Sequence, residues 1–122
     1  MHLTCEKRLL HKRKEKKMVR IIIGTTPTIH YAFQIVDPAD FTAAFLTIKD
    51  AEGTEVLRKG LDDAVTGEGS IEWKLSQAET LGLTPGGKYS MMLNWVLEDG
   101  TRGASYADLL LCDDNHIREV IV

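Results

Sequence analysis

A one-by-one alternation of apolar and polar residues, repeated in short runs from Met18 onward, constrains the fold of this chain most strongly. In the clearest run, residues 28–36, one side consists of Ile29, Tyr31, Phe33 and Ile35. Successive side chains of a β-strand point to opposite faces of a sheet, so a period of two indicates a strand with one buried face. Clusters of glycine, proline and aspartate separate the runs. The sequence therefore predicts an all-β domain.

Further runs of this kind predict about seven or eight short strands, spaced as in a β-sandwich rather than in strand–helix–strand units. The predicted strands cover residues 19–23, 28–36, 43–49, 54–59, 70–75, 88–98, 101–112 and 117–122, with a short strand expected near 64–65. The alternation changes phase near Asp108, which predicts a β-bulge or a change of sheet.

Two motifs predict how strands are connected. Ser76-Gln77-Ala78-Glu79 has the spacing of a capping box, which starts a helix that Gly82 or the glycines after Pro85 must end, so one short helix is expected near residues 76–82. Asp99-Gly100 predicts a type I′ hairpin turn of two residues. That turn would set Trp95 opposite Ala104, and Leu93 opposite Tyr106.

Most aromatic residues fall on the apolar sides of predicted strands. Those expected in the core are Tyr31, Phe33, Trp73, Tyr89, Trp95 and Tyr106. Phe45 is the exception, because it shares its side of the strand with Thr47 and Lys49. An exposed apolar group on a sheet can belong to a surface that a partner protein covers. Phe45 is therefore the candidate residue for an assembly surface.

The first seventeen residues differ in charge from the remainder. They hold seven basic and two acidic residues, whereas residues 18–122 hold eight basic and sixteen acidic ones. Such an acidic body repels a phosphate backbone, so no nucleic-acid partner is expected. Because Lys14-Glu15 fits the codons AAG-GAG of a ribosome-binding sequence, we expect residues 1–17 to be a translated leader and residues 18–122 a single domain. The alternatives are a disordered basic tail, or an arm that contacts nucleic acid or a membrane surface.

No apolar run approaches the roughly 18 residues of a membrane span, and the N-terminus lacks the apolar stretch of a secretion signal. We expect neither a membrane partner nor secretion by a signal peptide. Nothing in the sequence brings Cys5 and Cys112 within the Cα separation of about 7 Å that a disulfide tolerates. Both are therefore predicted to be free thiols, as in a reducing cytosol.

No pattern predicts a catalytic, cofactor or metal site. Cys112 and His116 could form a nucleophile–base dyad, but no shaped nucleophile turn surrounds them. The acidic stretches 62–68 and 113–116 lack the ligand spacing of a helix–loop–helix calcium site, so we interpret them as solvated turns. Asp37 and Asp40 are interpreted as turn chemistry and His30 as a surface histidine. A non-enzymatic protein is the prediction.

A series of segments carries a resemblance to a known family. In chain order they are Ile23–Ile29, Thr47–Asp50, Leu75–Leu81, Gly87–Tyr89 with Leu93–Trp95, and Glu98–Thr101. Together they resemble small immunoglobulin-like proteins of phages and prophages in Firmicutes and related bacteria, which are similar to N-terminal domains of phage (upper) baseplate proteins. The resemblance covers nearly all of residues 18–122, and Leu75–Leu81 is its most specific part.

The resemblance implies an immunoglobulin-like β-sandwich and a structural or assembly role in a phage tail or baseplate. Its partners would be other phage structural proteins or further copies of the chain, found in the virion or, before assembly, in the bacterial cytoplasm. The family supplies no catalytic motif. The rival hypothesis is a module that recognises a carbohydrate or host surface through loops such as Asp62–Gly69 and Asp99–Gly103. Those loops carry no Trp or Tyr, which favours the structural role.

Overall fold

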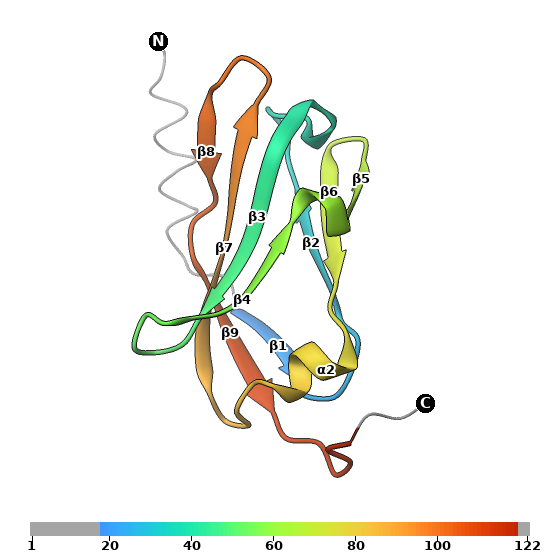
Figure 1. Ribbon diagram of the computed structural model, residues 1–122, viewed down its shortest axis with the longest axis vertical. Coiled ribbons are helices and arrows are strands. Elements are labelled where there is room, and N and C mark those ends of the chain that lie inside the picture. Colours follow the sequence, from blue (N-terminus) through green and yellow to red (C-terminus); the bar gives the residue numbers. More distant parts are fainter. Residues whose placement is uncertain (1–17, 120–122) are drawn as a thin grey trace.

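The computed structural model describes residues 18–119, which form two β-sheets packed face to face (Figure 1). The larger sheet has the strand order β1 (Met18–Ile22), β9 (Asp108–Asp113), β7 (Lys88–Leu97), β3 (Phe41–Lys49) and β4 (Glu55–Gly60), with β8 (Arg102–Ala104) also paired to β7. The smaller sheet has the order β2 (Thr28–Ala32), β6 (Ser70–Lys74) and β5 (Ala64–Gly67). The predicted all-β sandwich is confirmed.

The division of strands between the sheets is immunoglobulin-like. The strands β3, β7 and β9 share one sheet and β2, β5 and β6 the other, while β4 adds a strand beside β3 as in variable-type domains. The β1 strand pairs in parallel with β9, and the other strand pairs are antiparallel. Tyr89, near the start of β7, accepts a hydrogen bond of 2.7 Å from the backbone N–H of Thr84. This is the tyrosine corner of immunoglobulin-like sandwiches.

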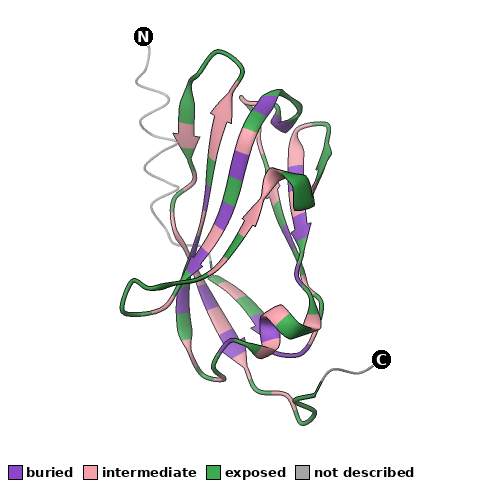
Figure 2. Cartoon of the chain, viewed as in Figure 1, coloured by how far each residue is buried: buried purple, intermediate pink, exposed green. Residues whose placement is uncertain are grey.

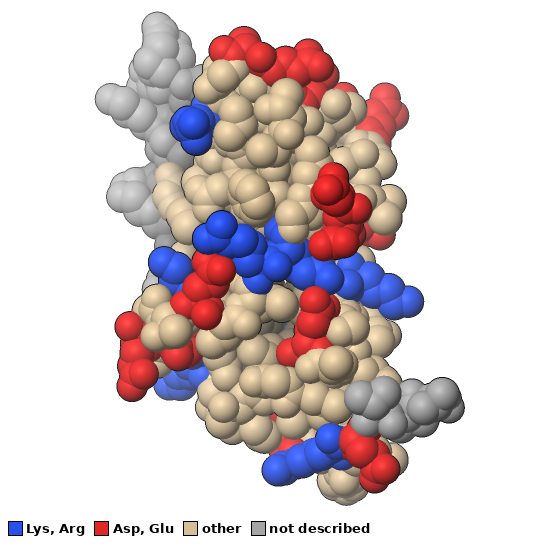
Figure 3. Space-filling view, viewed as in Figure 1, with Lys and Arg blue, Asp and Glu red and all other residues tan. Residues whose placement is uncertain are grey.

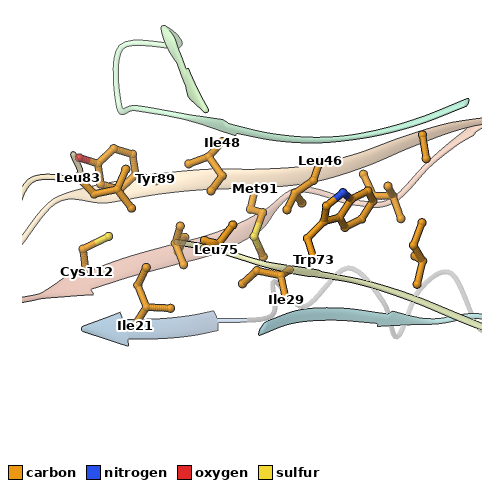
Figure 4. Close-up of a cluster of buried hydrophobic side chains, with 14 of the residues drawn as sticks. Ile21, Ile29, Leu46, Ile48, Trp73, Leu75, Leu83, Tyr89, Met91 and Cys112 are labelled. Carbon is orange, nitrogen blue, oxygen red and sulfur yellow. The ribbon is translucent and has the colours of Figure 1, made fainter. Parts of the chain in front are cut away.

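The core lies between the sheets and is built from the inward side of each alternating strand (Figures 2 and 4). Leu46 and Ile48 of β3, Leu93 of β7 and Trp73 of β6 have no exposed surface. The indole N–H of Trp73 donates a hydrogen bond of 2.8 Å to the carbonyl oxygen of Gly60. That bond satisfies the only polar group of the ring, so the ring can be fully buried without an unpaired donor.

The short helix α2 (Gln77–Leu81) joins the two sheets. As the sequence predicts, the hydroxyl of Ser76 accepts from the N–H of Glu79 at 3.0 Å, and the Glu79 carboxylate accepts from the N–H of Ser76 at 2.8 Å. Gly82 ends the helix. The carboxylate also pairs with Lys59 at 3.0 Å, which links the helix to β4. Buried Thr80 accepts from the N–H of Gly24 and donates to the carbonyl of Thr25, which fixes the connection between β1 and β2.

The predicted hairpin turn is wrong by one residue. Trp95 lies opposite Gly103 rather than Ala104, and Asn94 opposite Ala104. Within this turn only Gly100 has a positive φ, of 88°, and its N–H donates to the carbonyl of Leu97. The loop is therefore the three-residue type, in which a turn precedes a left-handed glycine. Asp99 favours this turn because its carboxylate accepts from the N–H of Thr101 at 2.9 Å.

Three further predictions fail where the chain leaves a sheet. The β2 strand ends at Ala32, because residues 33–37 cross to the larger sheet, and Ile35 is 88% exposed. Tyr106 is exposed rather than buried, since the predicted strand 101–112 is split into β8 and β9 by the linker that contains it. Both parts pair with β7, so the phase change near Asp108 marks a break within one sheet.

Residues 117–119 form no strand, while residues 120–122 and the predicted leader 1–17 lie outside the described part.

Candidate assembly surface

Phe45 lies on the outer face of the larger sheet, as the sequence predicts. Its neighbours along β3 at positions 44 and 46 are fully buried, so alternation turns the ring of Phe45 away from the core, where it is 40% exposed. Across the sheet it lies opposite Gly60 of β4 and Asn94 of β7. Neither neighbour has a side chain large enough to cover an aromatic ring, so Phe45 stands open to solvent.

Arg58 holds the Phe45 ring from one side. Its guanidinium carbon lies 5.5 Å from the ring centroid, a distance at which the cation is attracted to the ring face. The same guanidinium donates two hydrogen bonds to the carboxylate of Glu55, at 3.1 and 2.8 Å. The hydrogen bonds with Arg58 hold the pKa of Glu55 below its usual value. The ring and its cation are thus placed before any partner arrives.

A shallow hollow of about 330 Å³ lies beside this ring on the same face. It is lined by Thr47, Lys49, Glu55, Arg58, Ser90, Met92 and Asn94. In the space-filling view, Lys and Arg side chains form a band across the middle of the molecule, in the region where β4 runs (Figure 3). The surface around Phe45 therefore combines an apolar ring, neutral polar groups, the cations of Lys49 and Arg58, and the carboxylate of Glu55.

The outer face also exposes apolar groups at β1, which forms the edge of the larger sheet opposite to β4. Met18 and Ile22 are 56% and 48% exposed, because Val19 and Ile21 occupy the inward side of this strand. Arg20, between them, pairs with Asp113 of β9 at 3.0 Å. This patch was not predicted from the sequence, although the alternation of positions 18, 20 and 22 against 19 and 21 is the signal that could have located it.

Of the two residues of the candidate dyad, Cys112 is buried and His116 is exposed. Cys112 is 1% exposed, and burial, helped by Asp113, raises the pKa of its thiol to about 11. A thiol with that pKa is protonated at neutral pH and is a poor nucleophile. His30 and His116 are exposed. Within residues 18–119, no group of three or more His, Cys, Asp or Glu side chains could hold a metal ion.

Three of the acidic residues considered as possible ligands or catalysts form ion pairs or cap a helix. Asp113 pairs with Arg20, and Asp114 pairs with Arg118. Asp37 caps the short 3-10 helix η1 (Pro38–Asp40) by accepting from the N–H of Ala39 at 3.0 Å. The acids at 62 and 63 belong to a second such helix, η2 (Leu61–Asp63), between β4 and β5.

One end of the sandwich carries the tips of the two loops named in the rival hypothesis. The turn between β5 and β6 and the hairpin between β7 and β8 lie at the same end (Figure 1). Beneath them Phe33, Phe41 and Trp95 form an aromatic trio with centroid separations of 5.2 to 5.8 Å. Gly103 leaves room for the Trp95 ring, since a Cβ built there would lie 2.4 Å from it. The three rings therefore pack against one another at this end of the domain.

Comparisons with known proteins give this chain a structural likeness but no family. No protein-family model matches the sequence, and no curated protein matches it. Among solved structures, a strand-swapped dimer of the extracellular domain of mouse leukocyte-associated immunoglobulin-like receptor 1 is 12% identical, with 88% of this chain and 91% of that chain covered and a TM-score of 0.39. That likeness is too distant to carry an argument. No helix within residues 18–119 is long and apolar enough to cross a membrane.

Proposed function

We propose that this domain is a non-catalytic structural or assembly component of a phage or prophage particle, associated with its tail or baseplate. The resemblance of segments such as Leu75–Leu81 to phage and prophage proteins supports a place in a phage particle. The exposed ring of Phe45 supports the assembly role. The surface around Phe45 is the proposed contact with another structural protein. The exposure of the Phe45 ring is the observation that carries the proposal, since the other large apolar side chains of β3 lie inside the core.

The chemistry of this surface suits a protein partner. Aromatic and arginine residues are enriched among the side chains that contribute most to protein–protein affinity. Phe45 and Arg58 are already held against each other, and Arg58 is held by Glu55. Side chains that are ordered beforehand lose less conformational entropy on binding. A partner would cover the ring and fill the polar hollow beside it.

Particles from an induced host culture test this function. Mass spectrometry of purified particles should find this protein together with known tail proteins. A Phe45→Ala variant should be present in the lysate at the normal level but depleted from particles. Val65→Ala, which changes another exposed apolar residue but on β5 of the smaller sheet, is the matched control and should be incorporated normally. Equal incorporation of both variants contradicts the proposed surface, and absence of the wild-type protein from particles contradicts the structural role.

The second candidate function is a binding module for a carbohydrate or host surface. It is favoured by the position of the two loop tips at the same end of the sandwich (Figure 1). For such a module, substitutions Glu68→Lys and Asp99→Lys should abolish binding to host cells, while Phe45→Ala leaves it unchanged. The structural role predicts no binding of the purified protein to host cells.

A further inference from the structure

The β2 strand leaves one edge of the smaller sheet without a described neighbour. It pairs with β6 on one side only (Figure 1). The N–H of Phe33 donates to Gly69 and the N–H of Leu75 donates to Pro27, so the odd-numbered residues of β2 turn their backbone groups toward β6. In an antiparallel pair the alternate residues direct theirs the other way. The free edge therefore presents the N–H and C=O groups of Thr28, His30 and Ala32.

The other sheet edges carry features that discourage pairing. The β4 edge has the charged residues Glu55, Arg58 and Lys59 and follows a register shift against β3. β1 carries Arg20, β8 has three residues, and β5 has four. Charged, short or irregular edges are how proteins avoid pairing with other chains. β2 has none of these features: it is five residues long, regular and uncharged.

This edge lies within an uncharged stretch. Residues 21–36 contain no Asp, Glu, Lys or Arg, in a chain in which 27% of residues are charged. Two copies with bodies of the same acidic sign repel each other over most of their surface. Electrostatics therefore favours their approach along this neutral strip over any acidic part of the surface.

We propose that two copies of this chain pair through β2, antiparallel about a two-fold axis at His30. His30 then lies opposite His30 of the second copy, and Thr28 lies opposite its Ala32. Each of the three residue pairs exchanges two backbone hydrogen bonds, because all of these residues direct their N–H and C=O groups outward. Every free group of the edge is satisfied, and the two smaller sheets become one continuous sheet.

The side chains agree with this register. Thr28, His30 and Ala32 are exposed on the outer face, so no large group blocks the approach of a second strand. On the inner side, Ile29 comes opposite Tyr31 of the second copy, and aliphatic–aromatic pairs across strands are favourable. The outer face of the larger sheet, with Phe45, takes no part in this pairing. The same dimer can therefore contact other proteins through two copies of that face.

A five-residue pairing makes a small interface, so the free protein should dimerise weakly. Interfaces below about 1,200 Å² are typical of transient complexes. Copies held side by side in a particle would pair far more completely, because tethering raises their effective concentration. Association is therefore measured by sedimentation velocity of the full chain over concentrations from about 10 to 500 µM.

Charge at position 30 provides the decisive test. His30→Lys or His30→Asp places two like charges opposite each other, which should raise the dissociation constant by about tenfold or more. An equimolar mixture of the two variants should dimerise again, because the new lysine of one copy would then face the new aspartate of the other. The matched control, Val65→Lys, adds a charge at the opposite edge of the same sheet and should leave dimerisation unchanged. Failure of the mixture to recover overturns the two-fold register.

Cross-linking identifies what covers the edge. In a Cys5→Ser background, His30→Cys should form an intermolecular disulfide, since paired residues of this kind have Cα atoms about 5.5 Å apart. Val65→Cys should not. A full chain that is monomeric at the highest concentration and gives no His30→Cys cross-link overturns the proposal. If the His30→Cys cross-link then formed after removal of residues 1–17, the chain would be covering its own edge.

Discussion

Gly60, at the end of β4, has an aromatic ring on each side of its sheet, and the two rings are held in opposite ways. On the inner side Trp73 is fully buried and donates to the carbonyl of Gly60. On the outer side Phe45 lies across from Gly60, 40% exposed and in contact with Arg58. The inner ring is fixed by close packing on all sides, whereas the outer ring is fixed by one cation. Stability should therefore depend on Trp73 and association on Phe45.

Trp73→Ala should produce the largest loss of stability. Removal of a fully buried indole leaves a cavity between the sheets, and such changes cost about 3–5 kcal/mol in the free energy of unfolding. Trp73→Phe keeps most of the ring but leaves the carbonyl of Gly60 without its donor, so its loss should be smaller. Urea unfolding of both variants measures the difference. A loss below about 1 kcal/mol for Trp73→Ala would contradict the description of the core.

Gly103→Ala should produce the next largest loss. A Cβ at this position would lie 2.4 Å from the ring of Trp95, so the ring must leave the position in which it packs against Phe33 and Phe41. Overpacking of this kind costs about 1–3 kcal/mol. Trp95→Leu removes the obstruction, so the double variant should be more stable than the sum of the single effects predicts. Additive losses would mean that Trp95 and Gly103 do not meet, and would favour the register with Ala104.

The hairpin and β2 show what the sequence could and could not predict. Alternation alone located most strands, the capping box located α2, and the polar side of strand 43–49 located Phe45. The turn register depends on which residue takes the left-handed conformation, and Asp99-Gly100 is compatible with two solutions. The alternation of the sequence also continues through Ile35, although β2 ends at Ala32. A period of two does not reveal where the chain leaves one sheet for the other.

The candidate surface was predictable only in part. The exposure of Phe45 follows from β3 alone, but its contact with Arg58 depends on the pairing of β3 with β4, including a register shift at Ile48. The unpaired edge of β2 depends on the whole strand order. Features that arise from the pairing of distant segments cannot be read from the local pattern of either segment.

Glu79→Gln should have a smaller effect that depends on pH. Burial acts to raise the pKa of Glu79, but the N–H of Ser76 and the ammonium of Lys59 outweigh it and hold the pKa below the ordinary value of 4.5. The carboxylate therefore stabilises the fold above that value, and this stabilisation is lost as the pH falls through the lowered pKa. At pH 7 the variant should be less stable by about 1 kcal/mol or less. The difference should shrink in urea unfolding at about pH 3. A difference that stays constant with pH would contradict the lowered pKa of Glu79 and thus the stabilisation of its carboxylate by Ser76 and Lys59.

Phe45→Ala should likewise change stability far less than Trp73→Ala. The ring is partly exposed in the native state, and its cation–π contact with Arg58 contributes about 0.5–1 kcal/mol at an exposed site. Arg58→Ala should lose a similar amount, and the double variant little more, because both single changes break the same contact. Urea unfolding of the three variants measures this coupling. If Phe45→Ala cost as much as Trp73→Ala, the ring would belong to the core, and its depletion from particles could no longer be attributed to a lost contact with a partner.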